Sequence, residues 1–358
     1  MLAESLLDKR CIMVCGGGGV GKTTIAASLA IAAAKVRKRV LVVTIDPAKR
    51  LLQAFGFENA YLQEGGEPLP LSKTLMKELG LPENANLSIA VLNPKYVLNQ
   101  ILDQTLPTAH ADKLRNTTLF SEMSQMIYGL QEYTAYEWVT RMIQNNEYDL
   151  IVLDTPPAAH AKDFFGAPEK IRNLMESGVF QMFIPKKSSW FSTVLSFNWL
   201  EKLLGHSVFG ESKIFFETFA ILRLRILERC ELLAQFFKND QVAVVAVSTP
   251  ETSAQIEFEG LSRFLLAKHI NIESLIVNQV ETLNGYTDDS RQTGLSAALQ
   301  AKLNQLRNDQ TARAELAKSR VNEIKSHYPG LEIIPVAMNY ASDGFEVLRA
   351  NSIQLGTN

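Results

Sequence analysis

The sequence predicts an α/β fold, a doubly wound and mostly parallel sheet with an inserted helical subdomain. Short β-branched runs alternate with longer helical patterns from one end of the chain to the other. Such alternation is typical of strand–helix–strand units, whose helices cover both faces of a sheet. Several runs are apolar at consecutive positions, which favours parallel strands that are buried on both faces. The expected strands span residues 11–15, 40–46, 87–93, 148–154, 242–248, 273–280 and 331–338.

Two long regions, 94–147 and 164–238, contain helical patterns and no strand pattern. The second is rich in aromatic residues, because 12 of the 18 Phe of the chain lie within it. Both regions lead back to the sheet. We therefore expect them to form one helical subdomain within a single domain that spans residues 1–358.

A polar segment, 295–327, carries Leu299, Leu303 and Leu306 at helical spacing. One apolar stripe on an otherwise polar helix is typical of a surface helix that packs against a core. We therefore expect this segment to lie on the sheet.

Composition limits the classes of function. Among 358 residues, 36 Lys and Arg are balanced by 38 Asp and Glu, which gives a formal net charge of −2. Broad nucleic-acid binding needs a surplus of basic residues, so we expect no nucleic-acid partner. The sequence has no apolar run of 18 residues and no signal-peptide pattern, so we expect no integral membrane segment. Three isolated cysteines form no CxxC, which indicates a reducing compartment, the cytoplasm.

The segment CIMVCGGGGVGKTT is the most informative part of the sequence. It fits the pattern G-x-x-x-x-G-K-[ST], after an expected strand and before a helix-forming run. Glycines without a Cβ let such a loop wrap around a phosphate, and the following helix directs its free N–H groups at the same anion. A glycine-rich turn with an incidental lysine is the alternative. The residues expected to bind the nucleotide are Gly16, Gly17, Gly18, Gly19, Val20, Gly21, Lys22, Thr23 and Thr24.

ATP and Mg²⁺ explain the polar residues in and near this loop. Lys22 neutralises charge on the β- and γ-phosphates, and the Thr23 hydroxyl ligates Mg²⁺. Asp154 ends an expected strand at the edge where such sheets bind ligands, and its carboxylate can hold the same Mg²⁺. Asp46 ends another strand pattern and can orient or deprotonate an attacking water. Alternatively, each aspartate caps a helix that follows its strand.

Further motifs follow the loop in a characteristic order. Along the chain they are GGGGVGKTT, DPAKRL, DTPPAAHA, VSTPETSAQIEFEGL, IVNQ and IIPVAMNYASDGFEVL. This set resembles the ArsA/Get family of deviant-P-loop ATPases, which are related to arsenite-pump ATPases and tail-anchored-protein-targeting factors. The resemblance covers essentially the whole chain. It implies ATP and Mg²⁺ as cofactors and a nucleotide-dependent dimer, formed by two copies of the chain or with a related ATPase subunit.

The resemblance also implies two switch segments. Asp46, followed by Pro47, falls in switch I as the carboxylate that activates water, and Asp46 is then catalytic together with Lys22. Asp154 and His160 fall in switch II, within DTPPAAHA.

The same resemblance implies a site for adenine. Asn278, in IVNQ, resembles the residue that hydrogen-bonds the base, and Pro335 with Val336 would flank it. An asparagine amide both donates and accepts hydrogen bonds, so it suits the edge of a purine.

One loop position departs from the family pattern K-G-G-x-G-K-[ST], whose first lysine reaches the phosphates of the partner subunit. Gly17 stands at that position. An intersubunit cation can change the rate of phosphoryl transfer by several orders of magnitude. Three outcomes stay open: hydrolysis is slow, the chain pairs with a subunit that retains the lysine, or a nearby cation takes over, with the candidates Lys49, Arg50 and Lys162.

The cysteines depart from the family as well. The CxxC that binds zinc in eukaryotic targeting factors is absent, and no cysteine follows IVNQ, so we expect no structural zinc there. Arsenite activation needs thiolates that lie close together. Cys11 and Cys15 occupy one face of the first strand, and Cys230 lies in a helical region. We interpret all three as small buried apolar residues.

The aromatic segment 179–205 and the apolar helix pattern 214–233 allow several interpretations. Flexible Met and Phe surfaces suit the recognition of apolar clients, and the resemblance implies a groove for the transmembrane segment of a hydrophobic membrane-protein client. One alternative is an ordinary core or dimer contact, because cores consist of such residues. Another is peripheral membrane contact through residues 183–200.

Together these patterns predict a Mg²⁺-dependent ATPase switch that targets or energises a membrane protein. A regulatory pseudo-ATPase subunit of a heterodimer, which binds nucleotide and scarcely hydrolyses it, is the alternative that Gly17 motivates. A positioning ATPase of the MinD/ParA type would need a basic DNA-binding face or a basic amphipathic tail, and the C-terminal RANSIQLGTN supplies neither.

Overall fold

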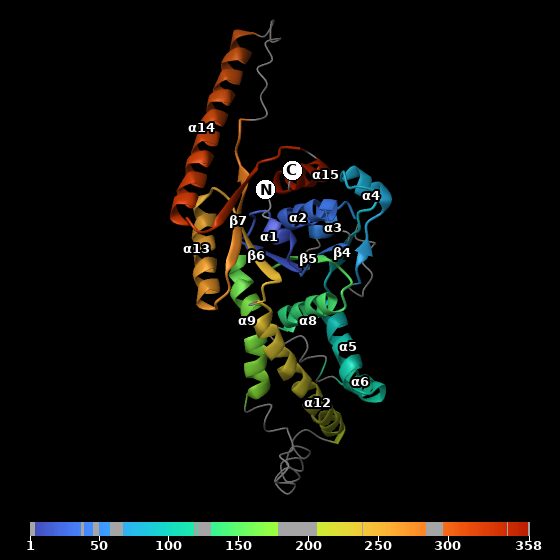
Figure 1. Ribbon diagram of the computed structural model, residues 1–358. Coiled ribbons are helices and arrows are strands. Elements are labelled where there is room, and N and C mark those ends of the chain that lie inside the picture. Colours follow the sequence, from blue (N-terminus) through green and yellow to red (C-terminus); the bar gives the residue numbers. More distant parts are fainter. Residues whose placement is uncertain are drawn as a thin grey trace.

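The structure is a computed structural model in which helices cover both faces of a central sheet (Figure 1). It describes residues 4–36, 39–45, 50–57, 67–117, 120, 130–177, 206–237, 239–283, 296–341 and 343–356. Asp46 and Pro47 of the expected switch I lie outside the described residues, and so does the aromatic segment 179–205.

The strands of the described chain form one sheet in the order β3-β4-β2-β5-β1-β6-β7-β8. Their bounds are β1 Cys11–Gly16, β2 Val40–Thr44, β3 Leu69–Pro70, β4 Leu87–Val91, β5 Leu150–Asp154, β6 Val242–Ser248, β7 Ile272–Val280 and β8 Glu332–Ala337. All neighbours pair in parallel except β3 and β4. The seven expected strands are confirmed, and with them the mostly parallel α/β class. The sequence did not predict the short edge strand β3.

Helices cover each face of the sheet and form a separate core with it. The helices that contribute to the first core are α1 Glu4–Leu7, α2 Lys22–Val36, α3 Arg50–Ala54, α4 Lys73–Glu78 and α15 Gly344–Leu355. The helices mainly on the second core are α5 Pro94–Thr105, α6 Thr108–Arg115, α8 Leu130–Gln144, α9 Ala158–Glu176, α12 His206–Phe236, α13 Thr252–Ala267 and α14 Ala297–His327. None of the helices in the described part of the chain has the length and apolar character needed to cross a membrane.

Strand β1 lies inside the sheet, between β5 and β6, and supplies residues to both cores. Ile12 and Val14 belong to the first core, whereas Met13 and Cys15 belong to the second. Successive side chains of a strand point to opposite faces, and here both faces are covered. This double burial explains why the strand is apolar at consecutive positions.

Helices α5, α6, α8, α9 and α12 pack on one another and extend below the sheet in Figure 1. The buried rings of Tyr136 and Phe164 lie 4.6 Å apart, between centroids, and join α8 to α9. Arg229 of α12 forms a 2.8 Å ion pair with Glu137 of α8 at a nearly buried position. These helices fall within the two predicted helical regions, but their core is continuous with that of the sheet. Their division into a subdomain stays a prediction.

The prediction for residues 295–327 is confirmed for the helix, and its expected packing on the sheet holds only for the C-terminal half. The C-terminal half of α14 packs on the body of the protein, and its N-terminal half projects beyond the sheet (Figure 1). Leu299 and Leu306 in the projecting half are 45% and 53% exposed. The residues that α14 buries are Ala314, Ala317, Val321 and Ile324. Apolar spacing identified the helix, but it does not indicate how far the sheet extends beneath it.

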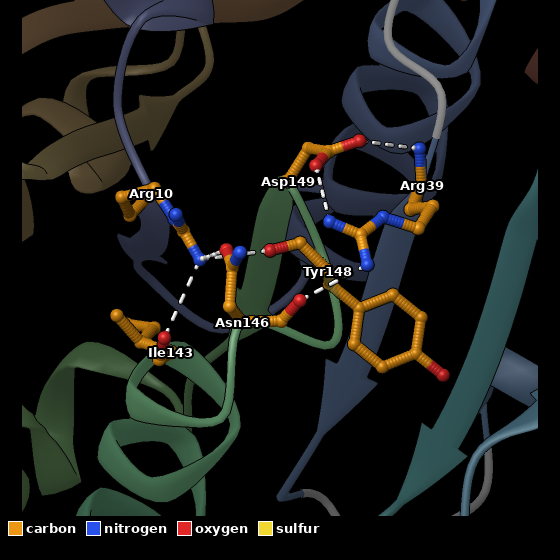
Figure 2. Close-up of polar contacts among 6 residues, drawn as sticks. All are labelled: Arg10, Arg39, Ile143, Asn146, Tyr148 and Asp149. Atoms are coloured by element: carbon orange, nitrogen blue, oxygen red, sulfur yellow. Dashed lines mark hydrogen bonds and ion pairs between the residues drawn. The ribbon is translucent and has the colours of Figure 1, made fainter.

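Two arginines hold together the amino ends of the central strands (Figure 2). Arg39 donates a side-chain hydrogen bond of 2.8 Å and a backbone hydrogen bond of 2.9 Å to the carboxylate of Asp149. The Arg10 guanidinium donates to the Asn146 side chain at 2.9 Å and to the Tyr148 carbonyl at 3.0 Å. The hydrogen bond from Arg39 holds the pKa of the Asp149 carboxyl below its ordinary value. These contacts join the segments before β1 and β2 to the connection between α8 and β5.

Candidate nucleotide-binding site

The glycine-rich loop connects β1 to α2 at the carboxyl edge of the sheet, where open parallel sheets place their ligand sites. Gly16 lies against the backbone of β6, since a Cβ on it would be 2.1 Å from the Val247 carbonyl oxygen. Gly19 and Gly21 have φ angles of 76° and 87°, in the left-handed region that favours glycine. Close packing and backbone conformation therefore both require glycine in this loop.

Lys22 begins α2 and is only 8% exposed. Its Nζ donates a 2.5 Å hydrogen bond to the Gly17 carbonyl oxygen, which places the ammonium over the loop. Burial lowers the pKa of Lys22, and the carboxylates of Asp154 and Glu257 oppose this shift. An ammonium that is partly removed from water gains from an anionic ligand. The phosphates of a nucleotide provide such a ligand.

A carboxylate and two hydroxyl groups meet beside the loop. The hydroxyls of Thr23 and Thr44 donate to the same oxygen of Asp154, Oδ2, at 2.8 Å and 3.0 Å. Asp154 is 1% exposed, at the end of β5. Hydroxyl and carboxylate oxygens are ligands that Mg²⁺ accepts, so Thr23 and Asp154 fit a Mg²⁺ bound together with phosphates. The structure brings together the two residues for which the sequence predicted this role.

Thr44 is a member of this cluster that the sequence reasoning missed. It ends β2, the neighbour of β5 on the side away from β1, and its hydroxyl donates a hydrogen bond that orients the Asp154 carboxylate. The available signal was a polar residue at the carboxyl end of the otherwise apolar run VLVVT.

The three residues expected at adenine have different surroundings. Asn278 of β7 is buried, and its Nδ2 donates a 2.9 Å hydrogen bond to the Val20 carbonyl oxygen of the loop. Pro335 is an exposed residue of β8, whereas Val336 is fully buried in the core that includes α2 and α15. The hydrogen bond of Asn278 is thus with the loop, and the adenine roles of all three residues stay predictions.

The switch residues are only partly described. His160 lies in the first turn of α9, shortly after β5, but its side chain is not among those described. The structure also does not describe Asp46 and Pro47. The switch roles of these residues therefore stay predictions.

The surroundings of Gly17 could not be predicted from the sequence. A Cβ on this residue would lie 2.4 Å from Oε2 of Glu257, a residue of α13. The position where the family pattern has a lysine thus faces a carboxylate. Among the three cations suggested as replacements, Arg50 has a described side chain, and its charge lowers the pKa of Lys22. Glu257 escaped notice because an acidic residue in a helical pattern usually indicates a solvated surface.

The geometry of this edge of the sheet defines the protein as a P-loop nucleoside triphosphatase by fold. The family model described as anion-transporting ATPase matches residues 9–341. The chain belongs to this family, and the ArsA/Get resemblance of its motifs is thereby confirmed.

Curated relatives agree with this assignment. A protein of Schizosaccharomyces pombe named ATPase get3 is 28% identical over 284 residues, which cover 77% of this chain and 76% of the relative. A protein of Podospora anserina named ATPase GET3 is 29% identical over 283 residues, covering 77% and 76%. An ATPase ASNA1 homolog of Entamoeba histolytica is 26% identical over 299 residues and covers 81% of each chain.

Proposed function

We propose that this protein binds Mg²⁺–ATP at the glycine-rich loop and hydrolyses it as a conformational switch. Membership of an ATPase family supports this activity at the family level. For this chain, the observation that carries the proposal is the 2.8 Å contact between Thr23 and Asp154, next to the partly desolvated Lys22. A cation and a pair of metal ligands at one phosphate loop meet the chemical needs of a bound nucleoside triphosphate.

Each residue of the site has a distinct task in this proposal. Lys22 exchanges its hydrogen bond with the Gly17 carbonyl for one with the β- and γ-phosphates, and the loop N–H groups bind the same oxygens. Thr23 and Asp154 would hold Mg²⁺, which supplies charge neutralisation when bound. Asp46 orients or deprotonates the attacking water. The γ-phosphate then distinguishes two states of the switch segments, which relax when it is lost.

The downstream role that we infer is the targeting or energising of a hydrophobic membrane protein, by a homodimer or a heterodimer with a related subunit. The family resemblance supports this role. Burial raises the pKa of Cys11 and Cys15 to about 12, and a buried protonated thiol is a poor ligand for arsenite. Client handling is therefore favoured over metalloid transport. The free cysteines also suit a reducing cytoplasm, which we propose as the compartment.

A nucleotide-binding regulatory subunit with little turnover is the second candidate. The position of Glu257 favours it, because its carboxylate stands where a side chain on residue 17 would begin, the position from which the family lysine extends. In such a heterodimer, the partner subunit would supply the missing cation.

A comparison of the wild type with Asp46→Asn distinguishes the two candidate functions and tests the catalytic role of Asp46. The variant should bind Mg²⁺–ATP like the wild type and lose phosphate release, since an amide can neither deprotonate water nor carry the negative charge. Asp240→Asn, at an exposed position on a connection before β6, serves as the matched control. A wild type that binds ATP without hydrolysing it would favour the regulatory subunit. An Asp46→Asn variant with normal turnover would refute the catalytic assignment.

A further inference from the structure

We propose that Asn278 is a positioning residue that holds the phosphate loop in its nucleotide-binding shape. This inference rests on the proposed function of the loop. The Asn278 Nδ2 donates a 2.9 Å hydrogen bond to the Val20 carbonyl oxygen, and both groups are buried. That carbonyl belongs to the peptide unit between Val20 and Gly21, directly before Lys22. A hydrogen bond from a strand side chain therefore fixes the peptide unit next to the last one of the loop, since α2 begins at Lys22.

The loop leaves space for this amide at Gly21. A Cβ on Gly21 would lie 2.4 Å from Asn278 Nδ2, closer than real Cβ contacts allow. Gly21 also has a φ angle of 87°, so the backbone conformation requires glycine independently. The Asn278 amide thus fills space that any side chain on residue 21 would need. The backbone of residue 21 also has a conformation that glycine adopts without strain.

The backbone of β7 sets the direction of this amide. The pairing of β7 with β8 shifts its register between Val277 and Val280. Within this irregularity, Gln279 has a φ angle of 59°, which is uncommon for a residue other than glycine. Bulges redirect side chains and are frequent beside functional sites, where the surrounding structure maintains the strained conformation. Asn278 directly precedes the strained residue, and its amide approaches the loop more closely than that of Gln279, whose Nε2 lies 3.9 Å from the ideal Cβ position of Gly21.

The position of the bond determines which ligands it affects. The hydrogen bond between Asn278 and Val20 holds the loop backbone that would surround the phosphates. A contact with the base would instead affect only ligands that contain adenine. Loss of the Asn278 donor should therefore weaken binding of any triphosphate, with or without a base. If Asn278 served adenine only, inorganic triphosphate would bind the variant as well as the wild type.

Asn278→Leu tests this distinction, because the variant keeps nearly the shape of the side chain, removes the donor and adds no charge that would itself repel a triphosphate. Mg²⁺–ATP and Mg²⁺ with inorganic triphosphate are titrated calorimetrically into both proteins. We expect both affinities to fall by the same factor, about tenfold, for a buried carbonyl left without its donor. The control is Asn351→Ala, at a buried asparagine of α15, which should bind both ligands like the wild type. A loss confined to ATP, or no loss, would overturn the proposal.

A second measurement needs no nucleotide. Hydrogen–deuterium exchange of the peptide that contains residues 17–23 is compared among the wild type, Asn278→Ala and Asn351→Ala, all without ligand. We expect faster exchange in this peptide for Asn278→Ala only. Exchange equal to the wild type would overturn the proposal even where Asn278→Leu fails to fold. A wild type that binds neither ligand would refute the proposed function, while the exchange result would still decide whether Asn278 holds the loop.

Discussion

The Thr23 hydroxyl donates a 2.8 Å hydrogen bond to Asp154 Oδ2 and thereby joins the first turn of α2 to the end of β5. The two residues are 131 positions apart in the sequence. They meet because β1 and β5 are parallel neighbours, with Val14 opposite Asp154, so that the loop after β1 and the end of β5 share one edge. The sheet topology thus assembles the proposed Mg²⁺ ligands from distant segments.

We expect Asp154→Asn to lose most of the Mg²⁺ dependence of ATP binding. The substitution removes the negative charge of a buried carboxylate, the proposed Mg²⁺ ligand, and preserves its shape, so affinity for Mg²⁺–ATP should fall by about tenfold or more. Affinity for ATP in EDTA should change little. Calorimetric titrations with Mg²⁺ and with EDTA measure both values. Asp149→Asn, directly before the amino end of β5, is the control. The assignment is wrong if Asp154→Asn retains the full Mg²⁺ effect.

We expect Gly17→Lys to increase ATP turnover by about tenfold or more, since a cation from a neighbouring subunit can contribute several orders of magnitude. The new side chain begins 2.4 Å from Glu257 Oε2, so that carboxylate must move, and it would then pair with the lysine. Gly17→Lys combined with Glu257→Gln should therefore be more active than Gly17→Lys alone. Phosphate release under steady-state conditions gives the comparison.

Arg50→Ala is the matching variant that removes a cation, because burial lowers the pKa of Lys22 and the charge of Arg50 adds to that shift. Unchanged turnover in Gly17→Lys, together with a large loss in Arg50→Ala, would contradict the account of a missing cation. It would identify Arg50 as the local replacement.

The contact between Arg39 and Asp149 makes stability depend on pH. The hydrogen bond from Arg39 holds the pKa of the Asp149 carboxyl below its ordinary value of 3.8. A carboxyl with a lower pKa in the folded state contributes stability above its unfolded pKa and loses it as the pH falls through the folded value. Asp149→Asn should therefore be less stable than the wild type at about pH 7, and the difference should shrink at about pH 3. Urea midpoints at both pH values test this, and equal differences would contradict it.

Much of the fold was predictable because its signals are local. Strands that are buried on both faces leave unbroken apolar runs, and β1, β2 and β6 followed that rule. The edge strand β3 could not be recognised, since it is two residues long and includes a proline. The projection of the N-terminal half of α14 was not predicted, because the leucine spacing is the same whether or not a sheet lies beneath the helix.

The candidate site was predictable where one segment carries the whole pattern. The glycines, Lys22 and Thr23 stand together, and Asp154 follows an obvious strand. The positions of Glu257 and Asn278 against the loop depend on how α13 and β7 pack, which no local pattern encodes. Asn278 was noticed through a family motif, but its hydrogen bond to Val20 appears only in three dimensions.

The central claim is that Lys22 and the loop bind a nucleoside triphosphate, and the most direct measurement is the stability of the wild type and Lys22→Ala with and without Mg²⁺–ATP. At a concentration of ~100 times the dissociation constant, the ligand should stabilise the wild type by about 2.7 kcal/mol. The same concentration should stabilise Lys22→Ala far less, relative to that variant without ligand. Equal stabilisation of the two proteins, or no stabilisation of the wild type, would contradict the claim.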